Sequence, residues 1–517
     1  MQHAPSTGIR QHLQRIGLLT ALLLGGCASV PQPAAVTTPR ISAQNLLQRS
    51  LGEPGLQRFL AAQTGTKHPA NQPWTASDLS LAALYFHPKL KLDQAALHLA
   101  EADLRIARQY PNPSLDLGLK YGAADVMAAP SPWTVGAAIG LLILSHSQRA
   151  AQTTQAEAGV RAAQLLLQDA HWQVQAGVQQ AFVALWAARH QARLQQQVLD
   201  SQLDLQGRTA VRAQAGLDAP LAAALAQEAA QRAALQLAAD RGAVQDAQAA
   251  LAAAIGLPAS ALNGVALDFA ELDAPTPQPD AARLARLRNK ALAQRLDVRA
   301  AWQRVHAAQA ALQLAQAQRD GGPPRLAPGG ERDQGVDRLT LTARVPLPLF
   351  NQHQGQIDAA RARLEQSQTA LQQVQLRALA AIDQAEAALR AAQQQHAESL
   401  QLRDADLALL HADLAAQHRG LLGPVTVLRA RLRALVTAQA ALKARVAQWR
   451  ALDALQTALQ QPLQRTEADG TSAPSPTAPS SQSPRNRPPV APHLSTVIWR
   501  ATAPDHSPPP WSQHADE

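Results

Sequence analysis

The chain has 517 residues, of which only 3% are aromatic, and alanine, leucine and glutamine are its most frequent residues. A thick globular core would lack the large side chains that fill it, so the composition favours helices that pack closely along their length. The formal net charge of +9 raises nucleic acid as a partner. However, basic and acidic residues alternate along the chain without a basic cluster or an aromatic stacking motif, and we therefore predict no nucleic-acid partner.

The N-terminus has the pattern of a secretion signal. The apolar run IGLLTALLL follows two arginines and is too short to span a membrane as a mature helix. It ends in LGGC, which resembles the lipobox of bacterial lipoproteins, and its Cys27 is the only cysteine in the chain. The resemblance implies removal of residues 1–26, acylation of Cys27 and, because Ala28 follows, sorting to the outer membrane. Residues 27–77 are then predicted to be a lipid-anchored extended tether.

Residues 78–265 and 280–462 are two copies of one unit. The stretches AQAGLDAPLAAALAQEAA and QHRGLLGPVTVLRARLRA place a Gly-Leu-x-x-Pro sequence at the same point of each copy, at a separation of 204 residues. Each copy is predicted to contain a first helix, a β segment, a helix of about sixty residues and, after the Gly-Leu-x-x-Pro break, a helix of roughly forty. The first helices are expected over 79–109 and 283–319.

The break between the two long helices carries its own signals. Gly216 and Gly420 suit a helix C-terminal cap with positive φ, and Pro220 and Pro424 suit the first turn of the helix that follows. A helix of about sixty residues extends roughly 90 Å, which exceeds a globular helix and matches a coiled coil or a tunnel wall.

The β segment of the first copy alternates between apolar and polar or small residues. Leu115, Leu117, Leu119 and Tyr121 would lie on one face, and the stretch from Trp133 to Leu141 repeats the pattern. An apolar face opposite a polar face is typical of a membrane β-barrel strand. A water-soluble amphipathic sheet gives the same alternation, so the pattern alone leaves both open.

In the second copy, the stretch LTLTARVPL shows this alternation again. Its outgoing partner should lie in GGPPRLAPGGERDQGVD, where glycine and proline predict a strand poorly. Pro346 and Pro348 end the pairing after the return strand, because proline cannot donate to a ladder.

The remaining sequence indicates no catalytic chemistry. There is no Walker A sequence, no HExxH, no GxSxG and no pair of cysteines with zinc spacing. His411 and His418 lie two helical turns apart, but we predict no metal site and no cofactor. Residues 463–517 are rich in proline and serine without an apolar period and are predicted to be a disordered tail.

Taken together, the chain resembles the TolC-like outer-membrane efflux channel family, and within it the lipoprotein members. The resemblance rests on ARQYPNPSLDLGL, VPLPLFNQHQGQIDAARA, AAAIGLP and the two Gly-Leu-x-x-Pro breaks. It implies a mainly α protein with a small β part, in which a homotrimer shares a twelve-strand outer-membrane barrel, four strands from each protomer. The helices would form an α-barrel in the periplasm.

The same resemblance assigns roles to individual residues. Gly216, Leu217, Gly420 and Leu421, at the hairpin tips, would dock a periplasmic adaptor protein, and an inner-membrane pump would supply the energy. Pro346 and Pro348 would form the hinge where a tilted strand turns into a near-axial helix. The chain would then be a passive exit duct for drugs or metal ions and not an enzyme.

Two alternatives remain open from the sequence. A lipidated periplasmic adaptor also has a lipobox and a helical hairpin, but it should have one hairpin flanked by β-rich domains. A structural coiled-coil lipoprotein without a pore would leave the amphipathic strands and the duplication unexplained.

Overall fold

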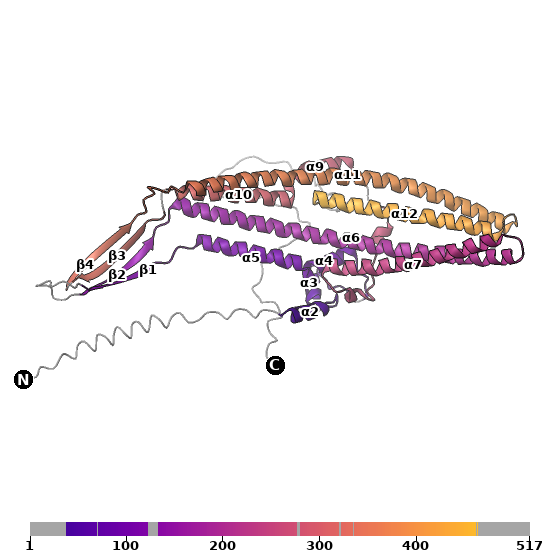
Figure 1. Ribbon diagram of the computed structural model, residues 1–517, viewed down its shortest axis with the longest axis horizontal. Helices are drawn as coiled ribbons and strands as arrows, with labels where there is room; N and C mark the ends of the chain where they lie inside the picture. The colour runs from indigo at the N-terminus through magenta and orange to yellow at the C-terminus, as the bar shows by residue number, and fades with distance from the viewer. Residues whose placement is uncertain are drawn as a thin grey trace, which may run out of the picture. The chain divides into compact units, whose positions relative to one another are not determined.

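Two long helical hairpins and a small sheet make up the computed structural model of the protein (Figure 1). The structure describes residues 38–69, 71–121, 133–276, 280–319, 322–333, 335–461 and 463. Cys27 and residues 464–517 lie outside them, so the predicted lipidation and the predicted tail stay predictions. The described residues all belong to one compact unit, residues 1–464.

The hairpins follow the predicted repeat closely. The long helices are α6 (His146–Gln214), α7 (Pro220–Ile255), α11 (Gln354–His418) and α12 (Pro424–Leu459). Helix α6 packs against both α7 and α12, so the two hairpins lie side by side. Alanine is the most frequent residue at the buried positions of α7 and α12, and its small side chain allows the close helix approach that the composition predicted.

Each predicted first helix is in fact two helices. The first is α4 (Ala76–Phe86) and α5 (Pro88–Arg108), and the second is α9 (Ala281–Gln294) and α10 (Leu296–Ala317). The break in the first copy comes at His87, which is extended because the residue before a proline is disfavoured in the α region. In Figure 1, α5 and α7 follow one another along the hairpin, as do α10 and α12.

The apolar core lies midway along the hairpins. It joins α4, the middle of α6 and the ends of α7 and α12, and its largest fully buried side chains include Trp186, Trp449 and Phe182. Two short elements of the segment between the repeats, η2 (Ala259–Leu262) and α8 (Ala270–Asp273), contribute Leu262 and Leu272. The last helix of each copy, α7 or α12, therefore ends in this same core.

The predicted extended tether is wrong for residues 38–69. This segment contains α2 (Pro39–Leu47) and α3 (Pro54–Thr64), and Leu56 and Leu60 of α3 are buried in the core. Arg49 donates from Nη1 to the carbonyl oxygens of Phe86 and Gly256, at 3.2 and 3.0 Å. The apolar residues of α3 and this cationic anchor fix the segment on the first repeat.

The residue that ends the last helix differs between the two repeats. Helix α7 ends at Gly256, with φ of +90°, whereas α12 ends at Gln460, with φ of +51°, one of only two positive-φ residues other than glycine in the described chain. The side chain of Gln460 accepts a hydrogen bond from Leu296 N–H at 2.7 Å and donates to Asp169 Oδ1 at 2.6 Å. The first copy has Pro88 in place of Leu296, and a proline has no N–H that needs an acceptor.

Replacing Gln460 by alanine should therefore destabilise the protein. The change leaves the Leu296 N–H without its acceptor and Asp169 without one of its two amide donors, while the positive φ remains. We expect a loss of about 1–3 kcal/mol in the free energy of unfolding. Thermal unfolding measures it, with Gln394→Ala on the exposed surface of α11 as the control, which should change stability by less than about 0.5 kcal/mol.

The four strands form one antiparallel sheet in the order β1-β2-β3-β4. They are β1 (Ser114–Tyr121), β2 (Trp133–Leu142), β3 (Arg325–Asp333) and β4 (Val336–Arg344). The poorly predicted strand is thus present, although it includes Pro328. Because β3 is paired on both sides, its neighbours compensate for its weak propensity.

Candidate functional site

One face of the sheet is apolar except for the ion pair of Arg332 with Asp337 near its far end. The register pairs Leu115 with Ile139 and Leu117 with Ala137 across β1 and β2, and Leu326 with Leu141 and Ala343 across β2, β3 and β4. Directly opposed residues share a face, so the alternating apolar residues of all four strands come together. They remain open to the surroundings in the protomer: Leu117 is 71% exposed, Leu119 66% and Leu339 96%. No described element covers this face.

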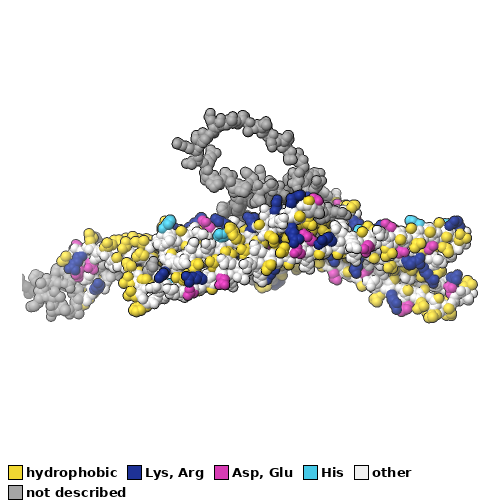
Figure 2. All heavy atoms as spheres, turned by 90° about the horizontal axis from the view of Figure 1, so that it is seen from above, with side chains coloured by type: hydrophobic (Ala, Val, Ile, Leu, Met, Phe, Trp, Pro, Cys, Tyr) yellow, Lys and Arg dark blue, Asp and Glu magenta, His cyan; other side chains and the backbone are white. Residues whose placement is uncertain are grey.

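Exposed aromatic side chains lie near both ends of the sheet. Tyr121 and Trp133 contact each other at the far end, with ring centroids 4.9 Å apart. At the helix end, Phe350 is fully exposed and Tyr110 is 75% exposed. Figure 2 shows apolar side chains gathered toward the end of the unit that holds the sheet. An apolar band between aromatic girdles is typical of the outer surface of a membrane barrel.

The opposite face of the sheet is polar. It carries small residues on β2, among them Gly136, Ala138 and Gly140, and charged residues on the other strands. Its acidic and basic residues form ion pairs across strands, such as Asp333 with Arg338 at 2.7 Å. The predicted division into an apolar and a polar face is therefore present in three dimensions.

The two outer strands of the sheet, β1 and β4, each pair on one side only. Their other edges present backbone N–H and C=O groups without partners from the sheet. Such edges in an apolar environment cost several kcal/mol for each unsatisfied group, so a membrane sheet needs further strands at both edges.

Pro346 and Pro348 lie in the segment between the end of β4 at Arg344 and the start of α11 at Gln354. The first copy makes the same transition in three residues, Ile143 to Ser145, and Ser145 caps α6 by accepting from Gln148 N–H at 3.2 Å. The hinge role of the two prolines stays a prediction, and the non-proline first copy shows that the transition does not require proline.

The two hairpin tips have the same backbone geometry. Gly216 and Gly420 have φ of +72° and +76°, and the N–H groups of Leu217 and Leu421 donate to carbonyl oxygens five residues earlier, at 2.9 Å in both. This is a Schellman cap, which glycine fits at the least cost. It leaves the side chains of Leu217 and Leu421 66% and 69% exposed. The structure thus brings each predicted glycine and leucine together at one end of its hairpin (Figure 1).

The tips differ in charge. Arg212 holds Asp218 through two hydrogen bonds of 2.8 and 2.9 Å, and this pairing lowers the pKa of the Asp218 carboxyl. The second tip has Ala416 and Leu422 at the corresponding positions. The first tip therefore has an ion pair next to Leu217, whereas the second tip has two adjacent leucines, Leu421 and Leu422.

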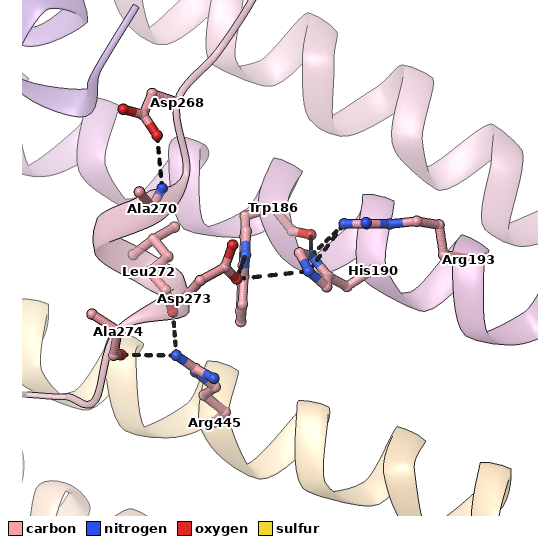
Figure 3. A network of polar contacts seen from close by, with 9 residues as sticks. All are labelled: Trp186, His190, Arg193, Asp268, Ala270, Leu272, Asp273, Ala274 and Arg445. Carbon is pink, nitrogen blue, oxygen red and sulfur yellow. Dashed lines mark hydrogen bonds and ion pairs between the residues drawn. The ribbon is translucent and has the colours of Figure 1, made fainter.

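A polar network fastens the segment between the repeats to both hairpins (Figure 3). Trp186 on α6 donates to Asp273 Oδ1 at 2.9 Å, and Arg445 on α12 donates to the carbonyl oxygens of Leu272 and Ala274 at 2.6 and 2.8 Å. Burial lowers the pKa of Arg445, and Asp273 partly offsets this effect. No local sequence pattern predicts this network, because its partners are backbone carbonyls or lie far apart in the chain.

Other site types are not supported. Within the described ranges, no three or more His, Cys, Asp or Glu residues cluster in a way that suits a metal ion. None of the helices that the structure describes is both long and apolar enough to cross a membrane.

Part of the chain matches a known protein family. Residues 79–257 match the family model described as outer membrane efflux protein. No curated protein shows a significant sequence match to the chain. The match agrees with the prediction that the chain is not an enzyme, since the family it describes consists of efflux proteins.

Solved channel structures have the same fold. The outer membrane protein VceC from Vibrio cholerae is 19% identical, with a TM-score of 0.62 over 79% of this chain and 98% of VceC. The outer-membrane channel OprN is 18% identical, with a TM-score of 0.61 over 84% of this chain and 98% of OprN. The MtrE outer membrane channel from Neisseria gonorrhoeae is 18% identical, with a TM-score of 0.57 over 75% of this chain and 90% of MtrE. These matches confirm the predicted fold, mainly α with a small four-stranded antiparallel sheet.

Proposed function

We propose that the chain is the outer-membrane channel component of a tripartite efflux system. It would act as a passive exit duct for drugs or metal ions, anchored by lipid at Cys27, with its helices extending into the periplasm. The observation that carries the proposal is the sheet, whose apolar face is exposed and whose two edges are unpaired. A membrane barrel shared between several chains explains both features at once.

The dimensions of the strands suit a bilayer. Ten residues of β2 at about 3.3 Å each extend roughly 33 Å. At the tilt of about 40° that membrane barrels adopt, the strand covers roughly 25 Å of membrane, which is the height of their apolar band. Four strands cannot close a barrel, so three copies would supply the twelve strands.

An exposed apolar stripe on α5 supports assembly from several copies. Leu92, Leu99 and Ile106 follow one another at intervals of seven residues and are 71%, 65% and 64% exposed. Residues at this spacing lie on one side of a helix, as in a coiled-coil seam. In a trimer, this stripe would lie against a helix of the neighbouring copy.

Conductance in a planar bilayer tests the proposal. The purified, acylated protein should insert and give discrete ionic current steps, because the trimer would enclose a water-filled duct. Neither a lipidated adaptor nor a structural coiled-coil lipoprotein would do so. A preparation that is folded by circular dichroism and yet carries no current under any condition of voltage or salt would contradict the channel function.

The hairpin tips are proposed to dock a periplasmic adaptor protein. The combined change Leu217→Asp and Leu421→Asp should weaken adaptor binding at least about tenfold, because two exposed leucines would no longer bury apolar surface against the partner. Adaptor affinity is measured by surface plasmon resonance on the immobilised trimer. Unchanged trimer migration in gels shows that the variant is assembled, and an assembled variant with wild-type affinity would rule out these leucines as docking residues.

A further inference from the structure

Two arginines lie side by side on the polar face of the sheet, where the strands meet the helices. Arg325 begins β3 and Arg344 ends β4, and the register pairs them directly. Directly paired residues share a face, and Leu326 beside Arg325 pairs with Leu141 on the apolar face. Both arginines therefore belong to the polar face, which would line the lumen of the proposed barrel.

Arg325 is held in place and neutralised. It forms an ion pair with Asp116 on β1 at 2.9 Å and contacts Ser114 Oγ, so its side chain reaches across β2. It can do so because Gly140 of β2 lies beneath it: a Cβ at this position would overlap the guanidinium. The pair between Arg325 and Asp116 leaves no net charge of its own.

Arg344 has no such counter-charge. Its side chain is exposed and forms no ion pair or hydrogen bond with any residue that the structure describes. Toward the far end of the polar face, by contrast, basic and acidic residues balance. These are Lys120 and Arg338 on one side and Glu331 and Asp333 on the other. The uncompensated positive charge of the described polar face thus lies at its helix end.

We propose that Arg344, beside the fixed pair of Arg325 and Asp116, forms a basic belt at the helix end of the barrel lumen that favours the passage of anions. The inference rests on the proposed channel function. In a trimer, three copies of Arg344 would face one lumen at one level, and a ring of arginines in a pore attracts anions and repels cations. Solutes that carry a carboxylate or phosphate group would pass this level more readily than cations, so of the two proposed substrate classes the belt favours anionic drugs over metal ions.

Reversal potentials in a planar bilayer under a KCl gradient test this belt. Arg344→Gln should lower the permeability ratio of chloride to potassium by about threefold or more, and Arg344→Glu should lower it further. Arg344→Lys keeps the charge and should keep the wild-type ratio. Arg332→Gln is the matched control, since Arg332 lies on the apolar face in an ion pair with Asp337 at 2.9 Å, and the channels it forms should keep the wild-type permeability ratio.

The two proposals fail in different ways. A wild-type protein without conductance overturns the channel function and the belt with it. Wild-type and Arg344→Gln channels that conduct with the same permeability ratio overturn the belt alone. A ratio that falls equally in Arg344→Lys and Arg344→Gln also overturns it, because the effect would then not follow the charge.

Discussion

Replacing Leu339 by arginine is expected to prevent the trimer from assembling in the outer membrane, whereas Thr340→Arg, one residue further along β4, leaves assembly intact. Leu339 is 96% exposed on the apolar face of the sheet, and its neighbour Thr340 lies on the polar face. A charged residue on the lipid face of a barrel costs about 2–4 kcal/mol near the middle of the membrane. The cost would be incurred in each copy.

This pair of variants separates a membrane barrel from a water-soluble sheet. In a soluble protein, a side chain as exposed as Leu339 could become arginine within about 0.5 kcal/mol of the wild-type stability. The measurement is the fraction of protein that floats with outer membranes and migrates as a heat-sensitive trimer in gels. Equal assembly of both variants would show that this face does not contact lipid.

The second large effect concerns Asp453, which lies in α12 and is 5% exposed. Burial, with a smaller contribution from Glu271 on α8, raises the pKa of the Asp453 carboxyl to about 7. Its Oδ2 has no hydrogen-bond partner among the described residues. The protonated form is therefore favoured in the folded protein, and ionising this group costs free energy.

The sign of the pH dependence follows from the raised pKa. The native state holds the Asp453 proton at pH values where the unfolded chain has lost it, so stability falls as pH rises from about 4 through about 7 and then levels off. Asp453→Asn removes the titrating group. At pH 8 we expect the variant to gain roughly 2–4 kcal/mol relative to wild type, compared with their difference at pH 4.

Thermal unfolding at pH 4 and pH 8 checks this result. The unfolding temperature of wild type should drop more between the two values than that of Asp453→Asn. Asp246→Asn, at an exposed position on α7, serves as the control and should follow wild type. If Asp453→Asn and wild type show the same change with pH, the buried carboxyl does not titrate in this range.

Much of the fold could be predicted from local sequence. The turns from α6 to α7 and from α11 to α12 are set by a glycine cap and a first-turn proline in each case, whose backbone requirements act within a few residues. The alternation in β1, β2 and β4 likewise reflects which side of each strand faces an apolar environment. These features are local, and a single sequence is enough to predict them.

The rest depends on contacts between distant residues. Strand β3 contradicts its own propensity and forms because β2 and β4 pair with it on both sides. Gln460 adopts a positive φ because Leu296 and Asp169 bind its side chain, and Arg49 fixes the N-terminal segment through carbonyls of two other elements. The hydrophobic periodicity of a helix or strand does not indicate such distant partners. The tips were located correctly from the sequence, but the charge difference between them follows from the ion pair of Arg212 with Asp218.

Native mass spectrometry of the detergent-extracted protein tests most directly whether several copies of this chain build one barrel. We expect a single dominant species with three times the mass of the mature chain, because only additional copies can cover the open edges of β1 and β4. A stable monomer that keeps its sheet in detergent would contradict it.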